Sequence, residues 1–170
     1  EEQNVAIGSG AMSSVQQGSG VGDADNNVAI GYNALLGGDF EGNDRQLAGN
    51  IAIGAYALDG TAANAHTGTI AIGHNALTAC TSAAGNTAIG YLSGDVITDG
   101  SNNTLLGYGT DPHASGGAAQ IVIGQGVTGT GDSIMTVGSG SITASLGLDG
   151  SVPSWAAASS DERLKENIEE

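Results

Sequence analysis

The sequence predicts an all-β protein folded as a parallel β-solenoid, and three observations support this prediction. A short motif recurs along the chain, and Asn27-Val28-Ala29-Ile30-Gly31 is one of its clearest copies. Successive copies are spaced 23, 23, 19, 17, 17, 17 and 14 residues apart, and spacing on this scale is typical of stacked supersecondary units. Large side chains are scarce, because 30 of the 170 residues are glycine and only 4% are aromatic, so a thin solenoid fits better than a globular core.

Each copy of the motif predicts a short β-strand. β-Branched residues stand two apart, as in Val28 and Ile30, which is the alternation of a strand. The few residues before each glycine are too short a run for a helix. Alanine, as in Ala29, occupies the opposite face, where a half-exposed strand would carry polar residues. We therefore expect both faces to be buried, with a neighbouring element packed closely against the alanines.

Glycine closes every copy and asparagine opens most of them. Glycine is favoured where φ is positive or where two backbones approach closely, because a Cβ atom would be penalised there. Two explanations stay open for the asparagines: an amide ladder between successive coils, or the general preference of asparagine for turns and left-handed backbone. The structural glycines are Gly8, Gly31, Gly54, Gly73, Gly90, Gly107, Gly124 and Gly138, and the asparagines are Asn4, Asn27, Asn50, Asn86 and Asn103.

The remainder of each coil predicts a second strand and a variable connector. Two residues separate the glycine from an Ala-Leu pair, as in Ala34-Leu35 and Ala57-Leu58, and we expect this pair to form a second short strand that closes the coil. The connectors that follow differ in length. Such variation indicates bulges on the solvent side of a constant cross-section.

The chain divides into three segments. Residues 1–138 form the predicted solenoid of about eight coils, and residues 139–159 lose the repeat pattern. We expect Leu146, Leu148 and Trp155 to cap the last coil, because the end of a solenoid exposes apolar edges. Residues 160–170 change to helix-forming residues, and Ser159 with Glu162 fits a capping box. A short C-terminal helical segment is expected there.

The repeats resemble the head repeats of trimeric autotransporter adhesins of the YadA type. Residues 4–12 and 27–35 match the pattern N-x-V-A-I-G-x-x-A almost residue for residue, and phage tail fibres use related repeats. The resemblance covers residue 1 to about residue 138. It implies a left-handed parallel β-roll, a homotrimer, and small residues at the threefold contact between chains.

The C-terminal residues resemble the start of the intramolecular chaperone of endosialidases and phage tail spikes. Ser160, Asp161, Arg163 and Lys165 match its S-D-x-R-x-K signature. The resemblance implies self-cleavage of the Ser159–Ser160 bond, with Ser160 as the catalytic nucleophile and Lys165 as the base. A lysine can act as a base only where burial or neighbouring charge lowers its pKa, so we expect cleavage only when the complete chaperone domain is present.

The composition excludes several classes of partner. The formal net charge is −15, and nucleic acid is excluded because phosphate contacts require clustered Lys and Arg. No stretch approaches 18 apolar residues, so membrane insertion is not expected. Cys80 is the one cysteine, so an intrachain disulfide cannot form. Neither a signal peptide nor an initiating Met is visible, and we expect the chain to be a segment of a longer protein.

No cofactor or metal site is predicted. Asp-rich connectors at residues 23–26 and 39–44 place oxygens at calcium-like spacing but match no known calcium loop. The three histidines have no partner at zinc-ligand spacing. Tyrosines recur just after the repeat glycine and have two interpretations: a surface that contacts carbohydrate or protein, or lateral packing between coils. The residues are His66, His74 and His113, and Tyr32, Tyr56, Tyr91 and Tyr108.

These observations predict a structural protein and not an enzyme. We expect a homotrimeric rod segment of a phage tail fibre or related virion appendage that contributes to host attachment. Its partners would be other virion tail proteins and a host surface receptor or glycan. The alternative is the head of a bacterial trimeric autotransporter adhesin on the bacterial cell surface. A polysaccharide-degrading tail spike is disfavoured, because no carboxylate cluster can be placed on one wall of the solenoid.

Overall fold

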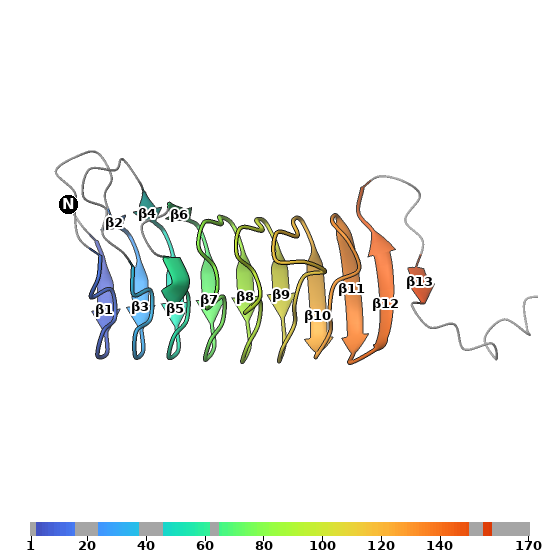
Figure 1. The fold of residues 1–170 in the computed structure, drawn as a ribbon, viewed down its shortest axis with the longest axis horizontal. Helices are drawn as coiled ribbons and strands as arrows, with labels where there is room; N and C mark the ends of the chain where they lie inside the picture. Colours follow the sequence, from blue (N-terminus) through green and yellow to red (C-terminus); the bar gives the residue numbers. More distant parts are fainter. Residues whose placement is uncertain (1–2, 16–23, 38–45, 62–64, 150–154, 158–170) are drawn as a thin grey trace, which may run out of the picture.

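The computed structural model describes residues 3–15, 24–37, 46–61, 65–149 and 155–157. Within these residues the chain is all-β and forms an elongated β-solenoid whose coils lie side by side (Figure 1). Helix is limited in this part of the chain to one 3₁₀ turn, η1 (Asp59–Thr61). The predicted fold class of an all-β solenoid is confirmed.

One long sheet runs the length of the molecule. Its ten strands follow the order β1-β3-β5-β7-β8-β9-β10-β11-β12-β13, and pairing is parallel from β1 to β11. The parallel strands are β1 (Val5–Ile7), β3 (Val28–Ile30), β5 (Ile51–Ile53), β7 (Ile70–Ile72), β8 (Thr87–Ile89), β9 (Thr104–Leu106), β10 (Ile121–Gln125) and β11 (Ile134–Ser139).

The alanine face of these strands lines the interior of the solenoid. Ala71 lies opposite Ala52 on one side and Ala88 on the other, and all three are fully buried within a single chain. Buried leucines, among them Leu58 and Leu77, fill the space beside them. The expectation that small residues form a contact between chains was therefore wrong, because the interior of the same chain already covers the alanines.

The repeat glycines form corners where successive coils touch. Gly54 has a φ of 131°, and a Cβ atom placed on it would lie 2.5 Å from the carbonyl oxygen of Gly73 in the next coil. Left-handed backbone and close approach therefore both occur at this corner. Gly138 differs: it faces Thr143 of the antiparallel strand β12 (Ile142–Gly147). The corner glycines with φ between 125° and 144° are Gly8, Gly31, Gly54, Gly73, Gly90, Gly107 and Gly124.

The Ala-Leu pair after each corner forms a turn and not the second strand that was predicted. Leu35 and Leu58 have φ values of 46° and 51°, which a strand does not allow. Both leucines are fully buried, and burial of their side chains offsets the cost of left-handed backbone, about 1–2 kcal/mol each. The turns stack on one another, since the Leu35 amide donates to the Ala57 carbonyl at 2.9 Å.

A second, shorter sheet lies on another side of the first coils. It contains β2 (Ala24–Asp25), β4 (Leu47–Ala48) and β6 (His66–Thr67) in parallel order. β2 and β4 come just before Asn27 and Asn50, which open the next copies of the motif, and β6 comes just before Thr69 in the same position. In the sequence, the second strand of each of these coils therefore precedes the motif, whereas the prediction placed it after the motif glycine.

The asparagines form buried amide ladders, which decides between the two explanations left open by the sequence. The side-chain amide and backbone N–H of Asn50 both donate to Oδ1 of Asn27 at 3.0 Å. The same amide donates to the His66 carbonyl at 2.9 Å, so each rung ties two coils together. One ladder contains Asn4, Asn27 and Asn50 and ends on the backbone of Thr69; the other contains Asn86, Asn103 and Gln120.

Left-handed backbone lies one residue earlier than the ladder asparagines. Asn26 and Asn102 have φ values of 58° and 62°, and Gly49, Gly68 and Gly85 take the same place in other coils. The ladder asparagines themselves do not have positive φ. Tolerance of left-handed backbone therefore does not explain why asparagine recurs at these positions. The side-chain hydrogen bonds of the ladders explain it.

Parallel pairing ends at β11. Strand β12 pairs with it antiparallel, and β13 (Trp155–Ala157) pairs antiparallel with β12 (Figure 1). Strands β11 and β12 therefore form a hairpin, and β12 pairs with the edge that β11 would otherwise leave free. The predicted helix over residues 160–170 lies outside the described residues.

Candidate functional site: the outer face of the long sheet

The face of the long sheet opposite the alanines points away from the interior and carries large apolar side chains. Strand alternation places Ile70 and Ile72 on this outer face, with the buried Ala71 between them. Because the register is constant, these side chains form two columns. One column contains Val5, Val28, Ile51, Ile70, Thr87, Thr104, Ile121 and Met135, and the other contains Ile7, Ile30, Ile53, Ile72, Ile89, Leu106, Ile123 and Val137.

The outer face is partly exposed and uncharged. Leu106 is 46% exposed and Ile89 36%, whereas the inner column is fully buried from Ala29 to Thr136. No residue of the two columns is charged, although the chain as a whole has a net charge of −15. A continuous exposed apolar surface of this kind is typical of an interaction site.

An aromatic ladder begins beside the corner glycines. Its ring centroids are 5.3 Å apart for Tyr32 and Tyr56, 6.0 Å for Tyr56 and His74, 5.4 Å for His74 and Tyr91, and 5.5 Å for Tyr91 and Tyr108. The last two pairs are stacked, with interplanar angles of 16° and 6°. Lateral packing between coils, one of the two interpretations of the tyrosines, is therefore observed. Tyr91 and Tyr108 nevertheless remain 47% and 55% exposed.

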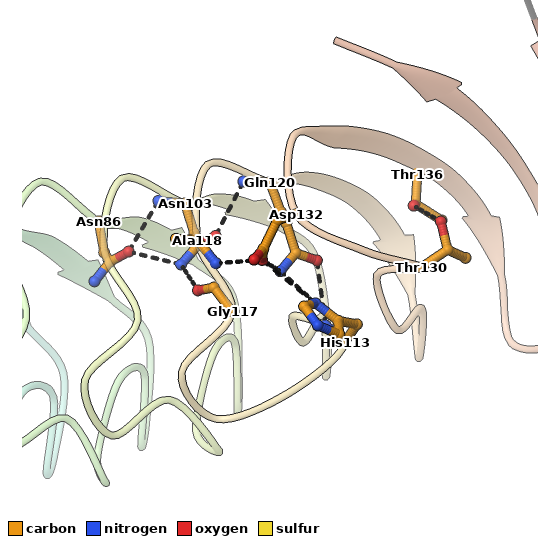
Figure 2. Close-up of polar contacts among 9 residues, drawn as sticks. All are labelled: Asn86, Asn103, His113, Gly117, Ala118, Gln120, Thr130, Asp132 and Thr136. Carbon is orange, nitrogen blue, oxygen red and sulfur yellow. Dashed lines mark hydrogen bonds and ion pairs between the residues drawn. The ribbon is translucent and has the colours of Figure 1, made fainter. Parts of the chain in front are cut away.

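The second amide ladder ends in a polar cluster at the surface (Figure 2). Gln120 replaces asparagine there, and its longer side chain reaches His113, with 2.9 Å between Nε2 and Nδ1. Asp132 accepts from the Ala118 amide at 2.7 Å and lies 3.6 Å from His113 Nδ1. The cluster fixes the loop between β9 and β10. Its hydrogen bonds join this loop to Gln120 and to Asp132.

Among the described residues, three titratable side chains have pKa values shifted by their surroundings. Burial lowers the pKa of His66, which takes the inner position beside Leu47 in the short sheet. Burial raises the pKa of the Cys80 thiol to about 12, so this cysteine is a poor nucleophile. Burial, together with the negative charge of Asp95, raises the pKa of Asp111 to about 6. The folded chain therefore favours the protonated, neutral form of the Asp111 carboxyl.

The residues singled out from the sequence are dispersed in the structure. Ser160 and Lys165 lie outside the described residues, as do Asp23 and the Asp-rich connector 39–44. The rest of the first Asp-rich segment is described: Asp25 ends β2, and Asn26 follows it with a φ of 58°. His66 is buried, His74 belongs to the aromatic ladder and His113 to the polar cluster. In the part of the chain that the structure describes, no three His, Cys, Asp or Glu residues lie close enough to hold a metal ion.

The outer face itself was missed by sequence reasoning. Alternation correctly separated the Val/Ile side from the Ala side, but it does not say which side is interior. The leucine of the Ala-Leu pair, such as Leu58, indicates which side is interior. A narrow coil that already contains a large buried leucine has room only for alanine on the facing strand. The volume of these leucines therefore places the alanines inside the coil and the Val and Ile side chains outside it.

No known family model, curated protein or solved structure matches the chain. In the described residues, no helix is long and apolar enough to cross a membrane.

Proposed function

We propose that the chain is a structural, non-enzymatic rod segment of an extracellular fibre, assembled as a homotrimer of left-handed solenoids with about eight coils each. The observation that carries this proposal is the uncharged apolar outer face, which continues from β1 to β11 without a covering element in the described chain. A face of this length is suited to a partner that is equally long and equally apolar. A second copy of the same chain meets both conditions.

Energetics favour association through this face. Complete burial of a Val or Ile side chain stabilises a protein by about 1.5–3 kcal/mol, and the side chains of the outer face are buried in part by the single chain. The remaining gain, summed over two columns, is similar in size to the usual net stability of a domain, about 5–15 kcal/mol. The acidic charge lies elsewhere on the coils and keeps the assembled rod soluble.

Within this class, we favour a phage tail fibre or related virion appendage over the head of a bacterial adhesin. The repeats support both, whereas the match of Ser160, Asp161, Arg163 and Lys165 to the chaperone signature supports the first. Restoring the natural downstream sequence distinguishes them. For a phage fibre, intact-chain mass should reveal cleavage between Ser159 and Ser160, and Ser160→Ala should abolish cleavage while the oligomer still assembles.

The oligomeric state tests the proposal directly. Sedimentation equilibrium should give about three times 16.5 kDa. Leu106→Glu, which places a charge on the outer face, should dissociate the oligomer because a buried, unpaired carboxylate is strongly unfavourable. Val96→Glu is a matched control: Val96 is 44% exposed against 46% for Leu106, but it lies outside the two columns. A stable monomer of the unaltered chain, or equal dissociation by both variants, would contradict the proposal.

A further inference from the structure

A face built from repeated identical residues leaves the alignment of associating copies undetermined. If one copy slides along another by a coil, Ile70 takes the place of Ile51 and Ile72 that of Ile53, and the apolar contacts are nearly unchanged. Register slippage of this kind is the known weakness of uniform strand faces. A fibre that must present all its chains at the same level needs a feature that breaks this uniformity.

Two polar residues interrupt the outer face. Thr87 and Thr104 are neighbours in one column, paired directly with each other and flanked by Ile70 and Ile121. Both point outward, since the residues that follow them, Ala88 and Leu105, are fully buried. Neither hydroxyl has a hydrogen-bond partner in the described chain. Every other position of the two columns is apolar.

We propose that Thr87 and Thr104 set the register in which copies of this chain associate, an inference that rests on the proposed oligomeric function. A hydroxyl both donates and accepts, so copies of the same threonine around a symmetry axis satisfy one another. This pairing requires that equivalent coils lie at the same level. A slip of one coil places one threonine of each copy against an isoleucine of the other, and a slip of two coils places both threonines against apolar residues. The buried hydroxyls that face apolar residues then lose their partners.

Single polar residues in apolar seams act in this way in coiled coils, where they specify register at a cost in stability. We expect the two threonines likewise to specify register and to lower the stability of the oligomer. Thr87→Ile with Thr104→Ile should leave the fold intact and raise the melting temperature of the oligomer, since the threonines lie on the surface of the single chain and isoleucine already occupies the flanking positions. The register, however, should no longer be unique.

Pulsed electron-spin resonance on the intact chain tests this inference. One spin label per chain is attached at Ser115→Cys, in an exposed loop outside the outer face, with Cys80→Ala to remove the native thiol. Copies in register give one narrow distance distribution. The double threonine variant should add a second population at longer distances, whereas Val28→Ile, which adds a methylene to the same column without removing a hydroxyl, should retain the single narrow distribution.

The outcomes separate the two proposals. Absence of any interchain distance means that the chain does not associate, and the proposed function fails. A single narrow distribution in the double variant, or a broad one already in the unaltered oligomer, leaves association intact and overturns the register role of Thr87 and Thr104.

Discussion

Asp111 is a described side chain whose ionisation opposes folding. It stacks on the coil that carries Asp95, and burial together with that neighbouring charge raises its pKa from 3.8 to about 6. The folded state therefore holds a proton on Asp111 between these two pH values, and the unfolded state does not. Because the folded pKa is raised, its stabilising contribution is complete below about pH 4 and is lost as the pH rises through about 6.

We predict that Asp111→Asn stabilises the protein at pH 8 by about 1–3 kcal/mol and has little effect near pH 3.5. Asparagine keeps the shape of the protonated acid and removes the buried charge. Urea unfolding at several pH values measures the difference. Asp99→Asn removes the same charge from an exposed position and should change stability by less than about 0.5 kcal/mol. A gain for Asp111→Asn that does not depend on pH would contradict the assignment.

The amide ladder is the element that joins coils through the interior, and it is broken at one position. Thr69 occupies the place of an asparagine: its backbone N–H donates to Oδ1 of Asn50 at 3.0 Å. Its side chain does not continue the chain of hydrogen bonds, and its buried hydroxyl has no partner. Asn86 starts the second ladder one coil later. Two ladders therefore exist where the repeat would allow one.

We predict that Thr69→Asn joins the two ladders and stabilises the protein by about 1–2 kcal/mol. The new side-chain amide can donate to Asn50 Oδ1, and its oxygen can accept from the Asn86 amide, as neighbouring rungs do at 2.9–3.1 Å. The measurement is the midpoint of urea unfolding. The reciprocal change Asn103→Thr, which breaks an existing ladder, should lower the midpoint; if Thr69→Asn lowers it as well, the gap at Thr69 is required by packing.

The strands and corners were predictable from sequence, whereas the faces and turns were not. Alternation and the glycine spacing depend on local backbone rules, which act within one copy of the motif, and both located β3, β5 and β7 correctly. Whether Ala71 lies inside depends on the volume left by leucines of other segments, such as Leu58. The pair Ala57-Leu58 resembles a strand locally, but closure of the coil imposes left-handed backbone on it. These features are set by tertiary packing.

At the scale of the whole molecule, each coil contacts its neighbours, and the interior is too narrow to hold a large core. Alanines and leucines, with Cys80, Ile97, Val122 and Val127, supply the apolar surface buried by one chain. Much of the apolar surface that the sequence encodes, including Ile72 and Leu106, lies on the outer face instead. In a solenoid, stability is a sum over coils and their interfaces. Under the proposed association, copies that cover the outer face would add to this sum.

Stability should therefore depend on protein concentration. We predict that a hundredfold dilution lowers the melting temperature by about 5 °C, because each chain loses about 2 kcal/mol of association free energy by mass action. Differential scanning calorimetry over this concentration range measures the shift. The Leu106→Glu variant, which cannot cover its outer face, should melt at a lower temperature that dilution does not change, and Val96→Glu should behave as the unaltered chain. If the unaltered chain melts at the same temperature at every concentration, the single solenoid is stable on its own and the outer face is not part of its folding unit.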